Sequence, residues 1–227
     1  MNRGVRYVLV GAFTLGLTLD SYGTIVITWG AESSTTFNLA NSTWLPVGDL
    51  IEVGTFSNTN GITQFSSAAG NLVNFAAFAT GYIGDGGLPD GFAYESDSAS
   101  DTGFAHQQIY LVAVNAPTIA AATEQGIWTV DFTINSSWRF PASTDSQNST
   151  LIDLEDLNSY LGALPNSTVN APLADGAHIV LGTPGITGGT DGNSGFALAV
   201  LIPEPSTDAL VATGILGMIG LIRHRRS

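Results

Sequence analysis

The sequence predicts a mainly β protein, an antiparallel β-sandwich of jelly-roll type with one or two short helices. The clearest evidence is Ile127–Ile134, where apolar residues at every second position alternate with threonine and aspartate, as in a strand with one buried face. Further short apolar stretches are bounded by Gly, Pro, Asn or Ser, which is typical of strands joined by turns. The chain contains no cysteine, so its core must be stabilised by burial without disulfides.

Six segments are expected to be strands. In Ile127–Ile134 the apolar face is expected to be buried and the threonine-bearing face exposed. In Gly195–Ile202, four apolar residues are expected to share one buried face, namely Phe196, Leu198, Val200 and Ile202. The other expected strands are Ile25–Trp29, Leu50–Phe56, Gln108–Val114 and Ala177–Leu181.

Two segments have helical spacing instead. Thr150 is expected to cap a helix on which Leu151, Leu154, Leu157 and Leu161 form an apolar stripe, ended by Gly162 and Pro165. A second helix is expected over Ser67–Ala79, where Gly70 weakens the pattern.

The charged residues separate an acidic central part of the chain from two terminal parts that carry nearly all of the arginines. Residues 24–202 form one expected acidic domain, whose only Arg or Lys residue is Arg139, and the whole chain has a formal net charge of −13. Because nucleic-acid binding depends on Lys and Arg neutralising phosphates, nucleic acid is not an expected partner.

The C-terminal part, residues 203–227, combines three features in a fixed order. The motif Pro203, Glu204, Pro205, Ser206 and Thr207 comes first, an apolar stretch over 209–222 follows, and a basic cluster over 223–226 contains Arg223, Arg225 and Arg226. As a helix the apolar stretch would be roughly 21 Å long, a short transmembrane segment, and the arginines would lie on the cytoplasmic side. The prolines separate this tail from the domain.

This order of motif, apolar stretch and arginines resembles the PEP-CTERM sorting signal of exported bacterial proteins. The resemblance covers about the last 25 residues, and Asp208 departs from it at the start of the apolar stretch. It implies recognition of Pro203, Glu204 and Pro205 by exosortase, an integral-membrane cysteine protease, and an association with exopolysaccharide. The alternative is a C-terminal membrane anchor that is never processed.

The N-terminal part, residues 1–23, agrees with export. Arg3 and Arg6 precede an apolar core over Tyr7–Leu19, and small residues follow it, as in a signal peptide. An uncleaved N-terminal anchor is the alternative. The expected location is therefore the membrane, and afterwards the cell surface or the extracellular matrix.

No catalytic motif is present, so we expect no enzyme activity. Gly192–Gly195 misses the spacing of a nucleophile elbow by one residue, and it also reads as a turn. His106 and His178 are interpreted as polar residues at strand edges. A hydrolase is the third alternative, because the chain has many carboxylates whose separation the sequence does not show.

No cofactor is expected, with calcium as an alternative. A glycine-rich loop over Gly84–Gly103 carries five carboxylates, and calcium prefers oxygen ligands from flexible loops. A solvated acidic turn explains the same residues, and EF-hand spacing is absent. The candidate calcium ligands are Asp85, Asp90, Glu95, Asp97 and Asp101.

The expected role of the domain is structural or adhesive, and a carbohydrate-binding or calcium-stabilised module is the alternative. Trp29, Trp44, Trp128 and Trp138 offer rings for stacking on sugars. Trp138, next to Arg139, is the better exposed candidate, although packing in the core is the favoured interpretation of this residue. Trp128 follows the buried alternation of its strand and is expected in the core.

Overall fold

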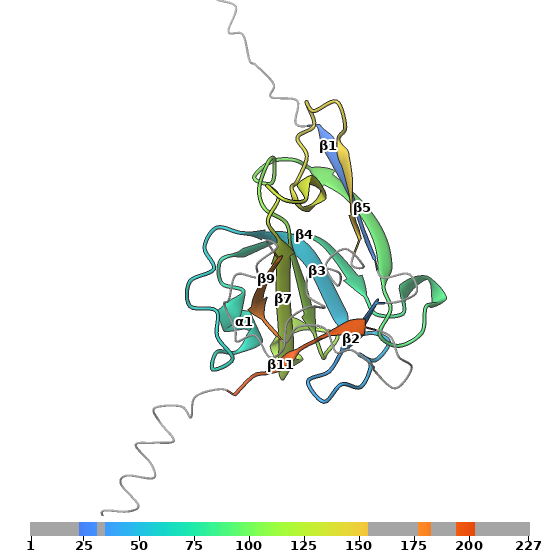
Figure 1. Ribbon diagram of the computed structural model, residues 1–227, viewed down its shortest axis with the longest axis vertical. Coiled ribbons are helices and arrows are strands. Elements are labelled where there is room, and N and C mark those ends of the chain that lie inside the picture. Colours follow the sequence, from blue (N-terminus) through green and yellow to red (C-terminus); the bar gives the residue numbers. More distant parts are fainter. Residues whose placement is uncertain (1–22, 31–34, 154–176, 183–193, 203–227) are drawn as a thin grey trace, which may run out of the picture.

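The computed structural model describes residues 23–30, 35–153, 177–182 and 194–202, which form a mainly β protein (Figure 1). The predicted fold class is confirmed at this level. The strands are β1 (Thr24–Gly30), β2 (Thr35–Asn38), β3 (Leu50–Phe56), β4 (Phe75–Tyr82), β5 (Tyr94–Ser100), β6 (Tyr110–Val114), β7 (Glu124–Val130), β8 (Ser149–Asp153), β9 (Ala177–Leu181), β10 (Ser194–Ala197) and β11 (Ala199–Val200). The helical elements are α1 (Ala68–Asn71) and three short 3₁₀ turns, η1 (Asp85–Gly87), η2 (Ile119–Ala121) and η3 (Ser136–Trp138).

These strands form three sheets. Sheet A has the order β5-β1-β8, sheet B pairs β10 with β2, and sheet C has the order β11-β7-β6-β3-β4 with β9 also paired to β7. Sheet C is antiparallel throughout, whereas β1 pairs with β8 and β10 pairs with β2 in parallel. The pairing is thus mostly antiparallel, as expected, and the two parallel pairs, which the sequence did not predict, join segments far apart in the sequence.

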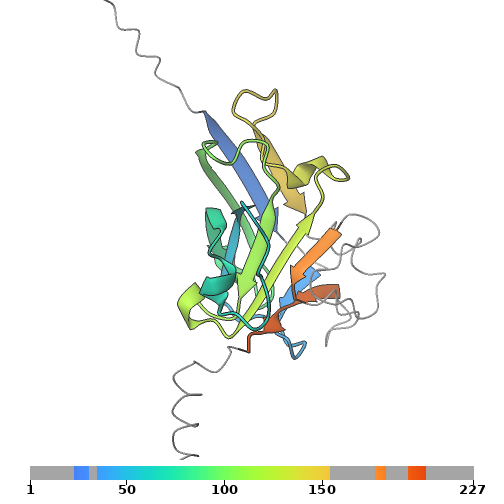
Figure 2. The same cartoon turned by 90° about the vertical axis from the view of Figure 1, so that its left-hand side faces the viewer.

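Sheet C is covered on both faces (Figure 2). A first core cluster packs Trp29 of β1 and Phe37 of β2 with Trp128 of β7. A second cluster on the opposite face contains Ile127 of β7 together with Ala68 of α1. Since alternate residues of β7 enter different clusters, the prediction of an exposed face on this strand is wrong.

β7 also has different bounds from the prediction, starting at Glu124 and ending at Val130. The Oδ1 atom of Asp131 accepts hydrogen bonds from the backbone N and the Oγ1 of Thr133, at 2.8 and 2.7 Å. This local turn competes with the sheet ladder and ends the strand. Ile134 consequently lies 52% exposed instead of in the core.

The predicted final strand is interrupted at Leu198. β10 pairs with β2, the N–H of Leu198 donates to the carbonyl of Asn38, and β11 then pairs with β7. The chain thus passes from sheet B to sheet C at this residue. Phe196 and Leu198 are buried as predicted, but Val200 and Ile202 are about half exposed.

Both helix predictions needed correction. Ser67 caps α1 as its side chain accepts from Gly70, but the helix ends at Asn71 and β4 begins at Phe75. Thr150 and Leu151 lie in β8 and not at the start of a helix. The rest of that predicted helix lies outside the described residues.

The signal peptide, the sorting motif, the apolar stretch and the terminal arginines also lie outside the described residues. Within the described part of the chain, no helix has the length and apolar character needed to cross a membrane.

Candidate functional site

The five predicted calcium ligands do not form one site. Two of them, Asp85 at the start of η1 and Glu95 on β5, lie beside each other. Burial, followed by the contact with Asp85, raises the pKa of Glu95. Among the described residues, no three His, Asp or Glu side chains gather in a way that could hold a metal ion.

The other three carboxylates are used separately. Asp90 accepts from the backbone N of Val47 at 2.9 Å, and Asp97 accepts from the N of Ser98 at 2.7 Å. Asp101 accepts from both the N and the Oγ of Ser143, and these hydrogen bonds lower its pKa. The three carboxylates therefore have separate local partners, and Glu95 and Asp97 belong to a strand that was predicted as a loop.

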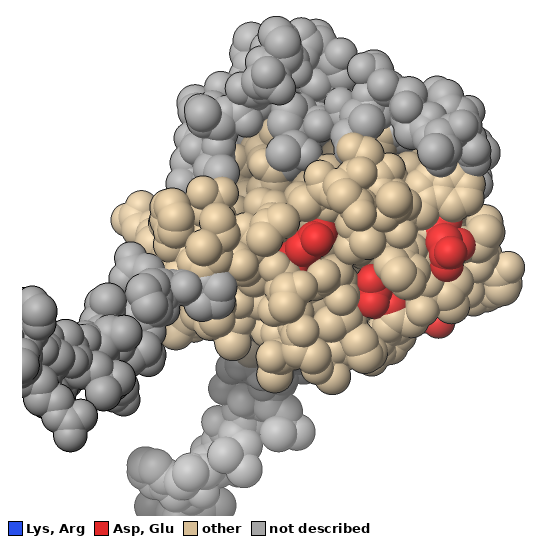
Figure 3. Space-filling view, turned by 90° about the horizontal axis from the view of Figure 1, so that it is seen from below, with Lys and Arg blue, Asp and Glu red and all other residues tan. Residues whose placement is uncertain are grey.

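A different acidic neighbourhood surrounds Asp49, which the sequence analysis did not single out. Asp49 is only 7% exposed, and burial followed by the nearby charges of Asp90 and Glu124 raises its pKa from 3.8 to about 6. On the face shown in Figure 3, the described residues display separate acidic patches and no Lys or Arg. A carboxylate held among like charges is a pH-sensitive element of this protein.

His106 lies in the turn before β6, with a positive φ of 65°. Its Nδ1 contacts the guanidinium of Arg139, and its Nε2 lies 3.4 Å from Oδ2 of Asp145. The ring nitrogens thus face a cation and a carboxylate, and not a serine nucleophile. His178 belongs to β9, as predicted for a strand residue.

The tryptophans do not form a sugar-stacking platform. Trp29, Trp128 and Trp138 are at most 1% exposed, so the favoured interpretation of Trp138 as a core residue is confirmed and its alternative as an exposed ring is wrong. Trp44 is half-buried and packs edge-on against Phe92. Trp138 is buried because η3 folds its backbone against Ile109, whose N–H donates to the carbonyl of Trp138 at 2.9 Å.

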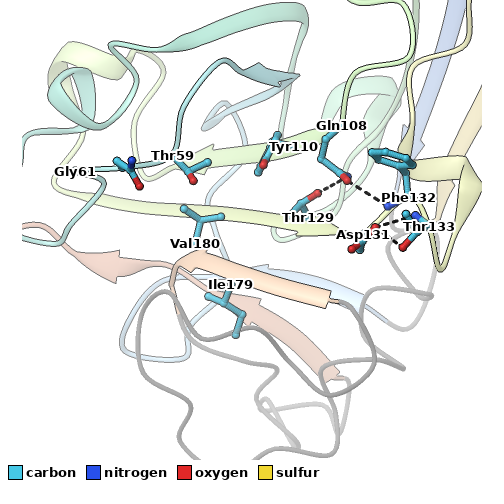
Figure 4. A pocket seen from close by; sticks show the side chains of 11 residues that line it. Thr59, Gly61, Gln108, Tyr110, Thr129, Asp131, Phe132, Thr133, Ile179 and Val180 are labelled. Carbon is cyan, nitrogen blue, oxygen red and sulfur yellow. Dashed lines mark hydrogen bonds between the residues drawn. The ribbon is translucent and has the colours of Figure 1, made fainter.

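A groove of about 730 Å³ lies on the face of sheet C that also carries the second core cluster (Figure 4). Its lining consists of Thr59, Asn60, Gly61, Gln108, Tyr110, Thr129, Asp131, Phe132, Thr133, Ile179 and Val180. We call these residues the β6–β7 groove. This volume is within the range of small-ligand sites, roughly 300 to 1,000 Å³.

Gln108 fixes the floor of the β6–β7 groove. Its Nε2 lies 2.7 Å from both Thr129 Oγ1 and the carbonyl of Val130, and 3.0 Å from the carbonyl of Trp138. Its Oε1 accepts from the N of Phe132 at 3.2 Å. One amide therefore ties the segment just before β6 to the end of β7 and to the turn that follows.

Two aromatic rings lie in the groove. Tyr110 packs edge-on against Phe56, with ring centroids 5.1 Å apart, and burial followed by the charge of Asp131 raises its pKa. The guanidinium of Arg139 lies 5.7 Å from the centroid of Phe132. Both rings are half-buried, so each keeps part of its surface for a ligand.

The threonine-bearing face expected for Ile127–Ile134 consists of Thr129, Asp131 and Thr133, and the sequence pattern predicts no function for that face. The register of β6 against β7, with Leu111 opposite Trp128, brings Gln108 and Tyr110 beside these residues. The alternation of polar and apolar residues within each strand can be seen in the sequence, whereas the pairing of the two strands cannot.

Comparisons with protein-family models, curated proteins and solved structures found no match to this chain.

Proposed function

We propose that the protein is exported and sorted to the cell envelope or extracellular matrix through residues 203–227, and that its folded domain has a structural or adhesive role there. The observation that carries the proposal is the order of the PEP-CTERM-like motif, the apolar stretch and the arginines. The acidic, lysine-free domain is consistent with a soluble surface protein, because high net charge keeps such a domain from associating nonspecifically.

The connection between the domain and residue 203 supports a structural role. β11 pairs with β7, and beyond it the N–H groups of Leu201 and Ile202 donate to the carbonyls of Thr123 and Gln64, at 2.8 and 2.7 Å. The chain is therefore bonded to the domain up to the residue before Pro203. Tension applied through the tail would reach the largest sheet directly.

We also propose that the architecture is a jelly-roll-like sandwich. The first core cluster joins residues of all three sheets, including Ile27 of sheet A, Phe196 of sheet B and Leu111 of sheet C. Packing of this kind between opposed sheets supports a sandwich.

The sorting proposal is tested by replacing Glu204 with Ala in the native host. The wild type is expected in the envelope or outside the cell at a mass reduced by processing, whereas Glu204→Ala is expected to accumulate in the membrane fraction at higher mass. Fractionation with intact-mass measurement reads both properties. Asp97→Ala, which removes one exposed carboxylate from β5, is the matched control and should sort as wild type. Identical location and mass of Glu204→Ala and wild type would contradict exosortase processing.

Carbohydrate binding is the second candidate function. The buried tryptophans do not support it, but the β6–β7 groove does, because it combines two half-exposed rings with hydroxyl, amide and carboxylate groups.

A further inference from the structure

We propose that Asn60 is a site of spontaneous covalent modification, at which the side-chain amide cyclises onto the backbone nitrogen of Gly61 and is then hydrolysed to isoaspartate and aspartate. The reaction needs water and no enzyme. This inference depends neither on how the protein is sorted nor on whether the β6–β7 groove binds a ligand.

The sequence singles out this asparagine by its neighbour. Asn60 precedes Gly61, and the sequence contains no other Asn-Gly pair. Cyclisation requires the backbone nitrogen of the following residue to reach Cγ of the asparagine. A side chain on that residue hinders the approach, whereas glycine has none and gives the backbone the freedom to bring the two atoms together.

The structure leaves both reacting groups accessible. Asn60 and Gly61 are exposed, in the connection between β3 and α1. Gly61 has a φ of 88°, and a Cβ built on it would have no atom within 4 Å. In the described part of the chain, neither the side chain of Asn60 nor the N–H of Gly61 makes a hydrogen bond. The cyclisation therefore breaks no internal bond.

Two other exposed asparagines lack this combination of features. The Oδ1 of Asn58 accepts from the N of Asn60 at 2.8 Å, and Asn58 is followed by Thr59, whose branched side chain shields its own nitrogen. The Oδ1 of Asn41 accepts from both the N and the Oγ1 of Thr43, at 3.0 and 2.7 Å. Exposure alone therefore does not select Asn60. Its unbonded amide and its glycine neighbour do.

The reaction is balanced with water as its only co-reactant. A hydroxide ion takes the proton from the N of Gly61, and this nitrogen forms a bond to Cγ of Asn60. The Cγ–Nδ2 bond breaks, and the leaving nitrogen takes a proton from water and departs as ammonia, which restores the hydroxide. One water molecule then opens the cyclic imide. Opening at the main-chain carbonyl of Asn60 gives isoaspartate, and opening at Cγ gives aspartate.

Either product changes the mouth of the β6–β7 groove. Asn60 lines this groove, and Figure 4 shows Thr59 and Gly61 at one end of it. A carboxylate there adds a negative charge to an already acidic protein. Isoaspartate also adds a methylene to the main chain just before Ile62, which is 3% exposed and belongs to the second core cluster. Because packed cores tolerate such displacements poorly, the modified protein is expected to have a lower Tm.

The experiment incubates the full-length protein, kept in detergent, at 37 °C in water enriched in oxygen-18, at pH 5 and at pH 8. Proteolysis and mass spectrometry then report on each asparagine separately. At pH 8 the peptide containing Asn60 is expected to exchange its amide NH₂ for a labelled OH, and electron-transfer fragmentation identifies the isoaspartate. At pH 5 the exchange should be slower, because less hydroxide is present to deprotonate the nitrogen of Gly61.

Two variants and one internal control make the test specific. Gly61→Ala should lose most of the labelled product, because its methyl group hinders the nitrogen without meeting a neighbouring atom. Asn60→Gln should also lose it, because the longer side chain has to close a larger ring. Thermal melting checks that both variants fold. Asn58 should keep its amide in every sample.

Three results would overturn the proposal. The first is an Asn60 that keeps its amide in the folded protein at pH 8, whether or not the urea-unfolded chain reacts. The second is an Asn58 that reacts as fast as Asn60. The third is a folded Gly61→Ala variant that forms the labelled product as fast as wild type.

Discussion

At the scale of single residues, Asp49 gives the protein a defined pH response. Its pKa rises from 3.8 to about 6 in the folded state through burial and the neighbouring charges of Asp90 and Glu124. The folded state therefore binds this proton more tightly than the unfolded state does. The resulting contribution to stability is complete below pH 3.8 and is lost as the pH rises through about 6.

We predict that Asp49→Asn is more stable than wild type at pH 8, and that this difference shrinks as the pH falls toward 4. The amide removes the charge that burial and the two neighbours disfavour. Urea unfolding at pH 4, 6 and 8 measures the effect. Asp97→Asn, which removes an exposed charge, controls for overall repulsion and should change the pH slope less. Parallel pH curves for Asp49→Asn and wild type would show that Asp49 does not titrate as described.

At the scale of elements, α1 depends on its cap although it has only one turn. The side chain of Ser67 accepts from the N of Gly70 at 3.1 Å, and Asn71 at the end of the helix donates to Gln125 at 2.9 Å. Ala68 meanwhile fills the second core cluster. The cap therefore holds a short element that covers one face of sheet C.

Ser67→Ala is predicted to lower the free energy of unfolding by about 1 kcal/mol, a typical value for a lost N-cap. Ser67→Asp keeps an acceptor at the cap and should stay close to wild type. Chemical denaturation of the three proteins gives the comparison. Equal destabilisation by Ala and Asp would mean that the packing of Ser67, and not its hydrogen bond, matters.

The elements also show where sequence patterns were sufficient. β3 and β9 have the predicted bounds, because each is a short apolar stretch between turn residues. β4 was predicted as part of a helix because Leu72, Phe75 and Ala79 have helical spacing, and its antiparallel pairing with β3 overrides that local signal.

β5 shows the opposite limit. Its residues are mostly Ser, Glu and Asp, which have little intrinsic preference for strands, and it forms only because it pairs along all of β1. Edge strands commonly carry charges that discourage pairing with other chains, as Glu95 and Asp97 do here. The same dependence on pairing explains why the β6–β7 groove could not be assembled from the sequence: its two strands contribute polar faces that meet only through their register.

At the scale of the whole molecule, stability must overcome self-repulsion. The chain has a formal net charge of −13, and within the described residues only Arg139 among Lys and Arg opposes the acidic side chains. The charges of Asp90 and Glu124 lie close enough to Asp49 to raise its pKa. Repulsion between exposed charges is screened by salt, whose Debye length falls from about 30 Å at 0.01 M to about 8 Å at 0.15 M.

We therefore predict that the Tm of the full-length protein rises between 10 and 150 mM NaCl at pH 7.5, by about 2 to 4 °C for each kcal/mol of repulsion removed. A thermal scan at each salt concentration measures the rise, and a nonionic osmolyte at equal osmolality should not reproduce its full size.

The same scan tests calcium when NaCl, MgCl₂ and CaCl₂ are compared at equal ionic strength. Screening alone acts equally on Mg²⁺ and Ca²⁺, whereas a calcium site formed around the Asp85–Glu95 pair would add stability only with Ca²⁺. Equal Tm values in the two divalent salts would remove calcium as a cofactor of this domain, and a Tm independent of NaCl would contradict the dominance of self-repulsion.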